Sequence, residues 1–125
     1  MPFRKPFNRI YKDNIIPIAK SCNLNPLRAD DIFTSSSIIE DIWEHFNRAK
    51  LIISDVSEKN PNVFYELGIA HTIGKDVIII TQNEDDIPFD LRHIRYFLYV
   101  DNEKGWNKLK EDLEKAIKST LNKRK

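Results

Sequence analysis

The stretch of residues 51–74, LIISDVSEKNPNVFYELGIAHTIG, constrains the fold more than any other part of the chain. Its opening apolar run, residues 51–56, is rich in β-branched side chains, which is typical of a strand covered on both faces in a parallel sheet. Asn60 is a favoured helix cap, and Pro61 suits the first helical position because proline has no backbone N–H to satisfy. The stretch therefore predicts a buried strand, a tight loop, and a helix that begins at Asn60 and ends near Gly74.

Glu66 is a charged side chain within this otherwise apolar helix. Asn62 precedes it by four residues, so both lie on one helix face, close to the amino end where backbone N–H groups point outward. A carboxylate is costly to bury unless it is paired or functional. Two interpretations stay open: a structural contact with Arg92, Arg95 or His71, or a functional acid in the crevice beyond the carboxyl ends of the strands, where open α/β sheets bind ligands.

Helices and strands are expected to alternate along the rest of the chain. Helices are predicted over residues 7–21, over 37–49 and from Gly105 onward, and Pro17 is expected to kink the first of them or to leave one backbone bond unmade. Strands are predicted over 76–81 and 96–100 and, weakly, over 25–30. A polar loop is expected over 82–86 and a short turn over 88–92. This alternation indicates a parallel sheet with helices on both faces.

The predicted class is therefore α/β, a three-layer α-β-α arrangement with a flavodoxin-like parallel sheet, in a single domain of residues 1–125. The first helix has no proper strand before it, so the first strand is expected to be truncated or missing. Three explanations remain open: Met1 to Phe3 is the stump of that strand, the natural chain begins upstream, or another chain supplies the missing edge.

Charge and composition exclude several function classes. The formal net charge is +1 and the basic residues are dispersed until the tail, which gives no case for a nucleic-acid polymer or a membrane surface as partner. Apolar runs are too short for a membrane span. Cys22 is alone, which excludes an intramolecular disulfide and favours a reducing cytoplasm.

Metals and cofactors are not expected either. Asp30 and Asp31 are adjacent acids, but no supporting cluster of ligands accompanies them, and the histidines lack zinc-site spacing. The glycines stand alone, so no phosphate loop or dinucleotide fingerprint is present.

Five segments carry a family resemblance: MPF, RADDI, DVSEKNPNVFYELGIAHTIGK, VIIITQ and IPFDLR. Together they resemble the nucleoside 2-deoxyribosyltransferase-like branch of the TIR-like Rossmannoid proteins, from Met1 to about Tyr99, and NPNVFYELGIAH is the most specific part. Members cleave or exchange the N-glycosidic bond of nucleosides or nucleotides, and many close relatives are known only as predicted nucleotide-binding modules attached to defence or signalling proteins. The resemblance implies a nucleoside, nucleotide or NAD as ligand. It also implies a homo-oligomer, because neighbouring subunits complete each pocket in the transferases.

The resemblance also assigns roles to individual residues. Glu66 falls on the catalytic glutamate, which attacks the anomeric carbon or stabilises an oxocarbenium-like centre. Asp55, at the end of a strand, is expected as a second catalytic group. Asn60 stands where the transferases carry an aspartate, and an amide can bind a hydroxyl but cannot act as a general acid. The residues expected to bind substrate are Phe3, Arg4, Arg28, Asp30, Asn60, Asn62, Phe89 and Arg92.

The predicted function is thus cleavage or transfer at the N-glycosidic bond of a nucleoside, nucleotide or NAD. Because Asn60 replaces the aspartate, hydrolysis and simple binding gain weight over transfer. The alternative functions are a non-catalytic nucleotide-sensing module and a TIR-like assembly domain in a signalling or defence system.

Overall fold

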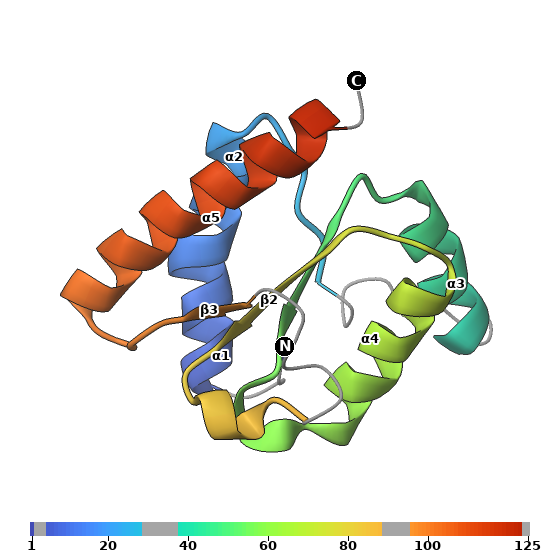
Figure 1. Ribbon diagram of the computed structural model, residues 1–125, viewed down its shortest axis with the longest axis horizontal. Helices are drawn as coiled ribbons and strands as arrows, with labels where there is room; N and C mark the ends of the chain where they lie inside the picture. The colour runs from blue at the N-terminus through green and yellow to red at the C-terminus, as the bar shows by residue number, and fades with distance from the viewer. Residues whose placement is uncertain (2–4, 29–37, 89–95, 124–125) are drawn as a thin grey trace.

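A computed structural model of the chain describes residues 1, 5–28, 38–88 and 96–123. Its sheet has three parallel strands in the order β1 (Ile52–Asp55), β2 (Val77–Thr81) and β3 (Tyr96–Leu98) (Figure 1). In the register of the sheet, Ile53 stands opposite Ile78, and Ile80 stands opposite Phe97. All three strands therefore end at one edge of the sheet, which is called the carboxyl edge below.

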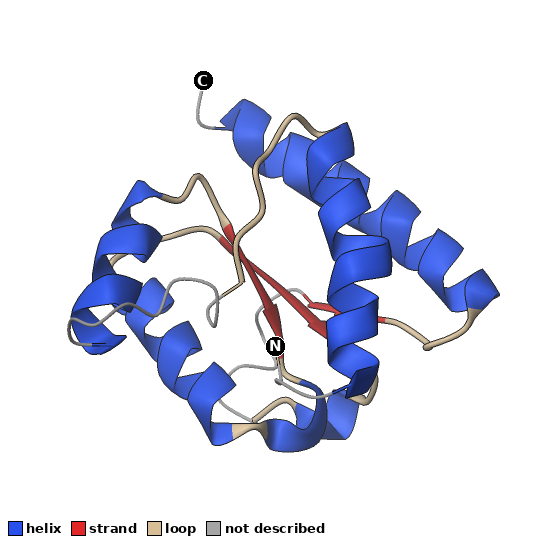
Figure 2. Ribbon diagram, turned by 180° about the vertical axis from the view of Figure 1, so that it is seen from behind, coloured by secondary structure: helices blue, strands red, loops and turns tan. Residues whose placement is uncertain are grey.

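Helices cover both faces of this sheet. One face carries a continuous helical run of α1 (Lys5–Ile10), η1 (Tyr11–Ile15) and α2 (Ile16–Ser21), together with α5 (Glu103–Lys123); the other carries α3 (Ile38–Arg48) and α4 (Pro61–Thr72). Figures 1 and 2 show the two groups of helices on either side of the strands. The predicted α/β class with a parallel sheet is confirmed. The flavodoxin-like strand order stays a prediction.

The side chains of β2 show how the core is divided. Successive residues of a strand point to opposite faces, so Ile78 and Ile80 face the first helical run and α5, whereas Ile79 faces α4. The first cluster contains the buried residues Phe7, Ile10, Ile15, Ile18, Ile78, Ile80, Tyr99, Leu109, Leu113 and Ile117, and the second contains Val56, Val63, Leu67, Ile79 and Ile87. Burial on both faces explains the continuous apolar run of β2.

The first helical run contains a proline and accommodates it with one wider, π-helical turn. Pro17 has no N–H to donate to the carbonyl four residues earlier. Just before it, the backbone N–H of Ile16 donates to the carbonyl of Tyr11, five residues back, within the π-helical segment η1. A single π-helical turn of this kind is a common accommodation in α-helices. The helix predicted over residues 7–21 is present, and it begins at Lys5.

Two sequence predictions were wrong in detail. Residues 25–28 of the weak candidate strand are not in a strand, consistent with Pro26, which cannot donate to a ladder. The last helix begins at Glu103 rather than Gly105, because Asn102 caps it by accepting a hydrogen bond from the Gly105 N–H at 2.7 Å. Gly105 instead permits close packing, since a Cβ there would overlap the carbonyl oxygen of Val100.

The loop predicted over residues 82–86 contains the short 3-10 helix η4 (Glu84–Asp86). The turn predicted over 88–92 and the strand stump at the amino terminus lie outside the described residues, except for Pro88 and Met1. Among the helices described, none is both long and apolar enough to cross a bilayer.

Candidate functional site

Helix α4 is fixed at both ends by backbone and cap hydrogen bonds. Asn60 Oδ1 accepts from the N–H groups of Asn62 at 2.9 Å and Val63 at 3.4 Å. At the other end Gly74 has a φ of 77°, and its N–H donates to His71 while the Lys75 N–H reaches back to the carbonyl of Ala70. These two bonds form a Schellman motif, for which a residue in the left-handed region is needed. The helix predicted from Asn60 to Gly74 is confirmed.

Glu66 lies on the flank of the buried stripe of α4. Val63, Leu67 and Ala70 are buried, whereas Glu66 is half-buried and Asn62 is exposed. At about 100° per residue, Asn62 and Glu66 share one flank, and His71 lies about 140° further round on the opposite side. His71 is exposed on that side of the helix, which does not favour the alternative of a proton shared with Glu66. Arg92 and Arg95 lie outside the described residues.

Asp55 occupies the carboxyl end of β1 and is almost sealed from solvent, with 1% of its surface exposed. Its Oδ1 accepts from the Ser57 N–H at 3.0 Å and from the Ser57 hydroxyl at 2.6 Å. Its Oδ2 accepts from the hydroxyl of Tyr99, just after β3, at 2.5 Å. Both carboxylate oxygens are therefore occupied by donors of the chain itself.

A fourth side chain extends these contacts to the central strand. Gln82 follows β2 directly; its backbone N–H donates to the Ser57 hydroxyl at 2.9 Å, and its Nε2 donates to the Tyr99 hydroxyl at 3.2 Å. We call Asp55, Ser57, Gln82 and Tyr99 the strand-end network. It joins the carboxyl ends of all three strands through hydrogen bonds in which each polar side chain has a partner.

The network perturbs the protonation of its two ionisable members. Burial raises the pKa of Asp55, and the hydrogen bonds from Ser57 and Tyr99 only partly oppose that rise. Burial, together with the negative charge of Asp55, raises the pKa of Tyr99. Tyr99 therefore remains a protonated donor to Asp55 throughout the neutral range, and Asp55 holds a proton more readily than an exposed aspartate does.

The loop between β1 and α4 holds an unusual backbone conformation. Glu58 and Lys59 have φ values of 67° and 55°, in the left-handed region that residues with a Cβ rarely adopt. Each such residue costs about 1 kcal/mol or more. The Glu58 N–H donates to a carboxylate oxygen of Asp86 at 2.7 Å, and this contact helps hold the loop in place. Strained loops of this kind concentrate at functional sites.

The residues predicted for the site fall into three groups. Asp55 ends β1 at the carboxyl edge, Asn60 caps α4, and Asn62 and Glu66 lie on the first half of that helix. Arg28 is buried against the first helical run, where its Nη1 donates to Asn8 Oδ1 at 2.5 Å and its guanidinium lies 5.6 Å from the centre of the Tyr11 ring. Phe3, Arg4, Asp30, Phe89 and Arg92 lie outside the described residues.

Four polar residues that contact Asp55 or Arg28, or that extend the strand-end network, were not predicted from the sequence: Asn8, Ser57, Gln82 and Tyr99. The position of Gln82 directly after a predicted strand was the one available signal. The partners of the other three are set by contacts between distant segments.

Two cavities lie elsewhere on the molecule. A cavity of about 650 Å³ adjoins Cys22, and one of about 140 Å³ lies between β2, β3 and α5. Neither is lined by a residue predicted for the site. Within the described ranges, no group of three or more His, Cys, Asp and Glu side chains is placed to hold a metal ion.

In comparisons with known proteins, no family model matches the chain, and neither a curated protein nor a solved structure matches it. The family suggested by the sequence resemblance therefore stays a prediction.

Proposed function

We propose that this chain is a nucleoside 2-deoxyribosyltransferase-like domain that acts at the N-glycosidic bond of a nucleoside, nucleotide or NAD. The observation that carries the proposal is that Glu66 and Asn62 share one flank of α4, the helix that begins beyond the carboxyl edge of a parallel sheet. Parallel α/β sheets bind their ligands at this edge. The strained loop before α4 gives further support, because such strain is retained where geometry serves a function.

The proposed chemistry assigns one role to each polar side chain at the start of α4. Glu66 attacks the anomeric carbon or stabilises positive charge there, while the bond from that carbon to the base breaks and its electron pair leaves with the base. Water then completes hydrolysis. Asn62 and Glu66 are separated by about 6 Å along the helix axis, a spacing that suits two groups on one sugar. The amide nitrogen of Asn60 makes no hydrogen bond within the described part of the chain, so it is a suitable donor to a ribose hydroxyl.

Asp55 is assigned a structural role in the proposed mechanism. Its two oxygens already accept three hydrogen bonds, and only 1% of its surface is exposed. This geometry favours a role in holding the strand ends, and through them the start of α4, over direct proton transfer. The catalytic role expected from the sequence stays a prediction, and base release by an Asp55→Asn variant tests it.

The test is release of free base. The protein is incubated separately with NAD, nucleoside 5′-monophosphates and deoxynucleosides, and the base is measured by chromatography. We expect base release from at least one substrate class, and its loss in Glu66→Gln. Glu111→Gln is the matched control, because Glu111 is an exposed α5 residue whose pairing with Lys115 contributes little to stability. Base release that persists in Glu66→Gln would remove Glu66 from the mechanism.

Nucleotide sensing without turnover is the second candidate. It is favoured by the engagement of Asp55 in the strand-end network and by Asn60, whose amide cannot supply a proton. A ligand that raises the melting temperature of both the wild type and Glu66→Gln, without release of base from either, would support this candidate. Sedimentation of the same samples measures whether the expected homo-oligomer forms.

A further inference from the structure

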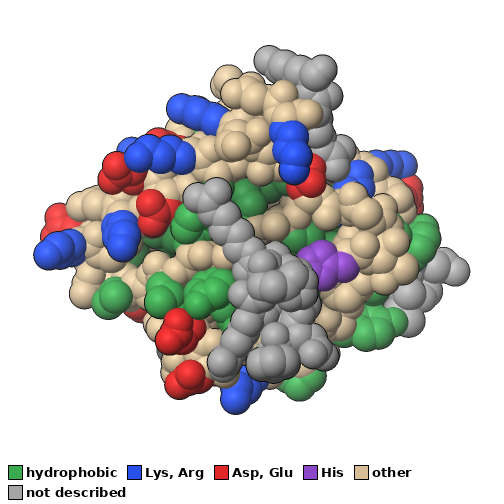
Figure 3. Space-filling view, viewed as in Figure 1, with side chains coloured by type: hydrophobic (Ala, Val, Ile, Leu, Met, Phe, Trp, Pro, Cys, Tyr) green, Lys and Arg blue, Asp and Glu red, His purple; other side chains and the backbone are tan. Residues whose placement is uncertain are grey.

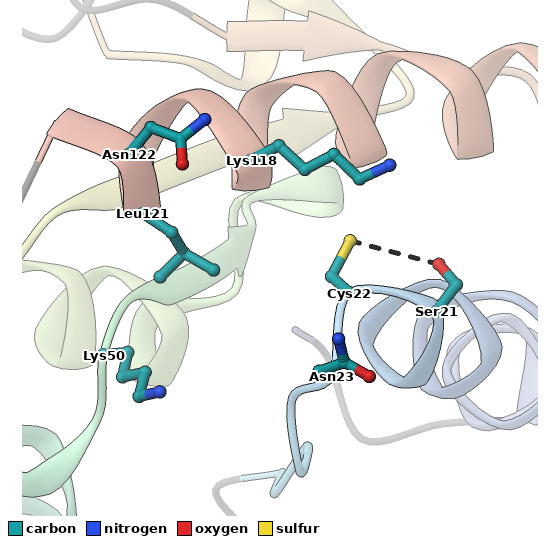
Figure 4. Close-up of a pocket in the computed structure, with 7 residues that line it drawn as sticks. All are labelled: Ser21, Cys22, Asn23, Lys50, Lys118, Leu121 and Asn122. Atoms are coloured by element: carbon teal, nitrogen blue, oxygen red, sulfur yellow. Dashed lines mark hydrogen bonds between the residues drawn. The ribbon is translucent and has the colours of Figure 1, made fainter. Parts of the chain in front are cut away.

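A concave surface lies near the amino end of β1, away from the carboxyl edge of the sheet. The cavity of about 650 Å³ lies between the end of α2, the segment just before β1 and the last turns of α5. It is lined by Ser21, Cys22, Asn23, Lys50, Lys118, Leu121 and Asn122. Its volume is in the range of sites that bind small molecules. In Figure 4, Lys118 and Leu121 project from α5, while Cys22 and Asn23 come from the opposing wall at the end of α2.

The lining is positively charged. Lys50 and Lys118 come from different segments, and none of the seven lining residues is acidic. Elsewhere on α5, Lys side chains are interspersed with Asp and Glu, as the blue and red side chains along that helix show (Figure 3). Within the described part of the chain, neither lysine has a salt-bridge partner. The cavity therefore combines two ammonium groups, neither of them in a salt bridge within the described ranges, with the side-chain amides of Asn23 and Asn122.

Capping of helix ends does not account for these lysines. The carbonyls at the end of α2 are satisfied by backbone, because Asn23 N–H donates to Lys20 and Leu24 N–H donates to Ala19, each at 3.0 Å. The last carbonyls near α3 are bound by Lys75, whose Nζ donates to Asn47 at 2.8 Å and Ala49 at 2.9 Å. Lys50 and Lys118 are not used in either cap.

The walls of the cavity are held in place by local structure. Asn23 adopts a φ of 61° as the left-handed residue of the α2 Schellman motif, which fixes its position at the cavity. The Ser21 hydroxyl, at the end of α2, lies 2.9 Å from Oε1 of Glu114 on α5. Glu114 is four residues before Lys118. This contact ties α2 to α5 across one side of the cavity.

We propose that this cavity is a binding site for a small polyvalent anion that carries phosphate or carboxylate groups. Lys50 and Lys118 supply the charge, the side-chain amides of Asn23 and Asn122 supply hydrogen-bond donors, and Leu121 contacts the apolar part of the ligand. The site is separate from the carboxyl edge, and its occupancy does not depend on the glycosidic chemistry proposed above.

Cys22 provides a local probe, because it is the single cysteine of the chain and lines the cavity. The rate of alkylation by the neutral reagent iodoacetamide is measured with and without pyrophosphate or citrate, at constant ionic strength maintained with sodium chloride. A bound anion slows alkylation, and the concentration dependence gives a Kd. The pyrophosphate and citrate arms distinguish a phosphate ligand from a carboxylate ligand. Each variant is compared with itself without anion, because loss of a nearby charge changes the intrinsic reactivity of the thiol.

We expect protection by at least one of the two anions in the wild type, with the Kd raised about tenfold in Lys50→Gln and in Lys118→Gln, equivalent to about 1.4 kcal/mol. Lys110→Gln is the matched control, since it removes the same charge from an exposed α5 position outside the cavity and should bind as the wild type does. Glu66→Gln should also be protected normally, which separates this site from the proposed function. Absence of protection by both anions in the wild type would overturn the proposal. So would a Kd in both lysine variants that equals the wild-type Kd.

Discussion

The hydroxyl of Tyr99 donates to Asp55 Oδ2 across the end of the central strand, and the two residues are 44 positions apart in the chain. Asp55 ends β1 and Tyr99 follows β3, and these two strands do not pair with each other because β2 lies between them. The hydrogen bond therefore fixes the spacing of the two outer strands at the edge from which α4 begins. Helix α4 starts six residues beyond Asp55, so the position of its first turn depends on this contact.

Tyr99→Phe should destabilise the fold. The substitution keeps the ring in the core but removes a donor to a buried carboxylate, and we expect a loss of about 2 kcal/mol in the free energy of unfolding. Urea denaturation measures the change. Tyr65→Phe is the control, because Tyr65 is 55% exposed on α4 and its hydroxyl should contribute within about 0.5 kcal/mol. Equal effects of the two substitutions would mean that the Tyr99 hydroxyl has no special role.

Asp55 should also make the stability depend on pH. Its pKa is raised in the folded protein by burial, so the folded state binds the Asp55 proton more tightly than the unfolded state does. The resulting stabilisation is fully present below the unfolded pKa of about 3.9 and is lost as the pH rises through the higher folded value. Asp55→Asn cannot titrate. We therefore expect the stability of the wild type, relative to Asp55→Asn, to fall as the pH is raised through this window.

The measurement is urea denaturation of both proteins at a series of pH values, since other groups titrate in both and cancel in the difference. Asp85→Asn, at an exposed position on η4, is the control and should not reproduce the trend. A relative stability that rises with pH would show that the hydrogen bonds from Ser57 and Tyr99 outweigh burial.

Two glycines near α4 should respond to alanine in opposite directions. Gly74 has a φ of 77° at the end of the helix, so Gly74→Ala should destabilise by about 1 kcal/mol. Gly68 lies within α4, and a Cβ there would meet nothing within 4 Å, so Gly68→Ala should stabilise by about 0.5 to 1 kcal/mol through helix propensity. Thermal unfolding monitored by circular dichroism measures both changes. A stabilising Gly74→Ala would contradict the Schellman motif.

Local signals explain what could be predicted from the sequence. The strand and helix of residues 51–74 follow from a buried apolar run, the Asn60 cap and the terminal Gly74, each of which acts within a few residues. The start of the last helix had a local signal of the same kind, the Asn102 cap, which the prediction from Gly105 passed over. Gly105 itself is needed because its backbone approaches the Val100 carbonyl closely, and that approach has no signature in the sequence.

In the candidate site, too, the residues with a local sequence signal were predicted and those positioned by distant contacts were not. Asp55 was identified because polar residues at strand ends gather at one edge of a parallel sheet, and Glu66 because an acid interrupts an apolar helix. Tyr99 reads as one more aromatic residue of a strand, and its role appears only when β1 and β3 are placed on either side of β2. The sequence indicated the edge of the sheet but not the hydrogen bonds that join its strands.

Asn60→Asp provides the last prediction, because it separates the stability of α4 from the proposed chemistry. Asn60 Oδ1 caps the helix, and aspartate caps equally well, so Asn60→Asp should retain the free energy of unfolding, whereas Asn60→Ala should lose about 1 kcal/mol. The resemblance places an aspartate at this position in the transferases. If a missing acid limits turnover, Asn60→Asp should increase base release by about tenfold or more, within the range that a positioned acid contributes. Unchanged base release with an intact cap would instead mean that position 60 serves the helix alone, and that any catalysis at this edge of the sheet proceeds through Glu66 without help from its first turn.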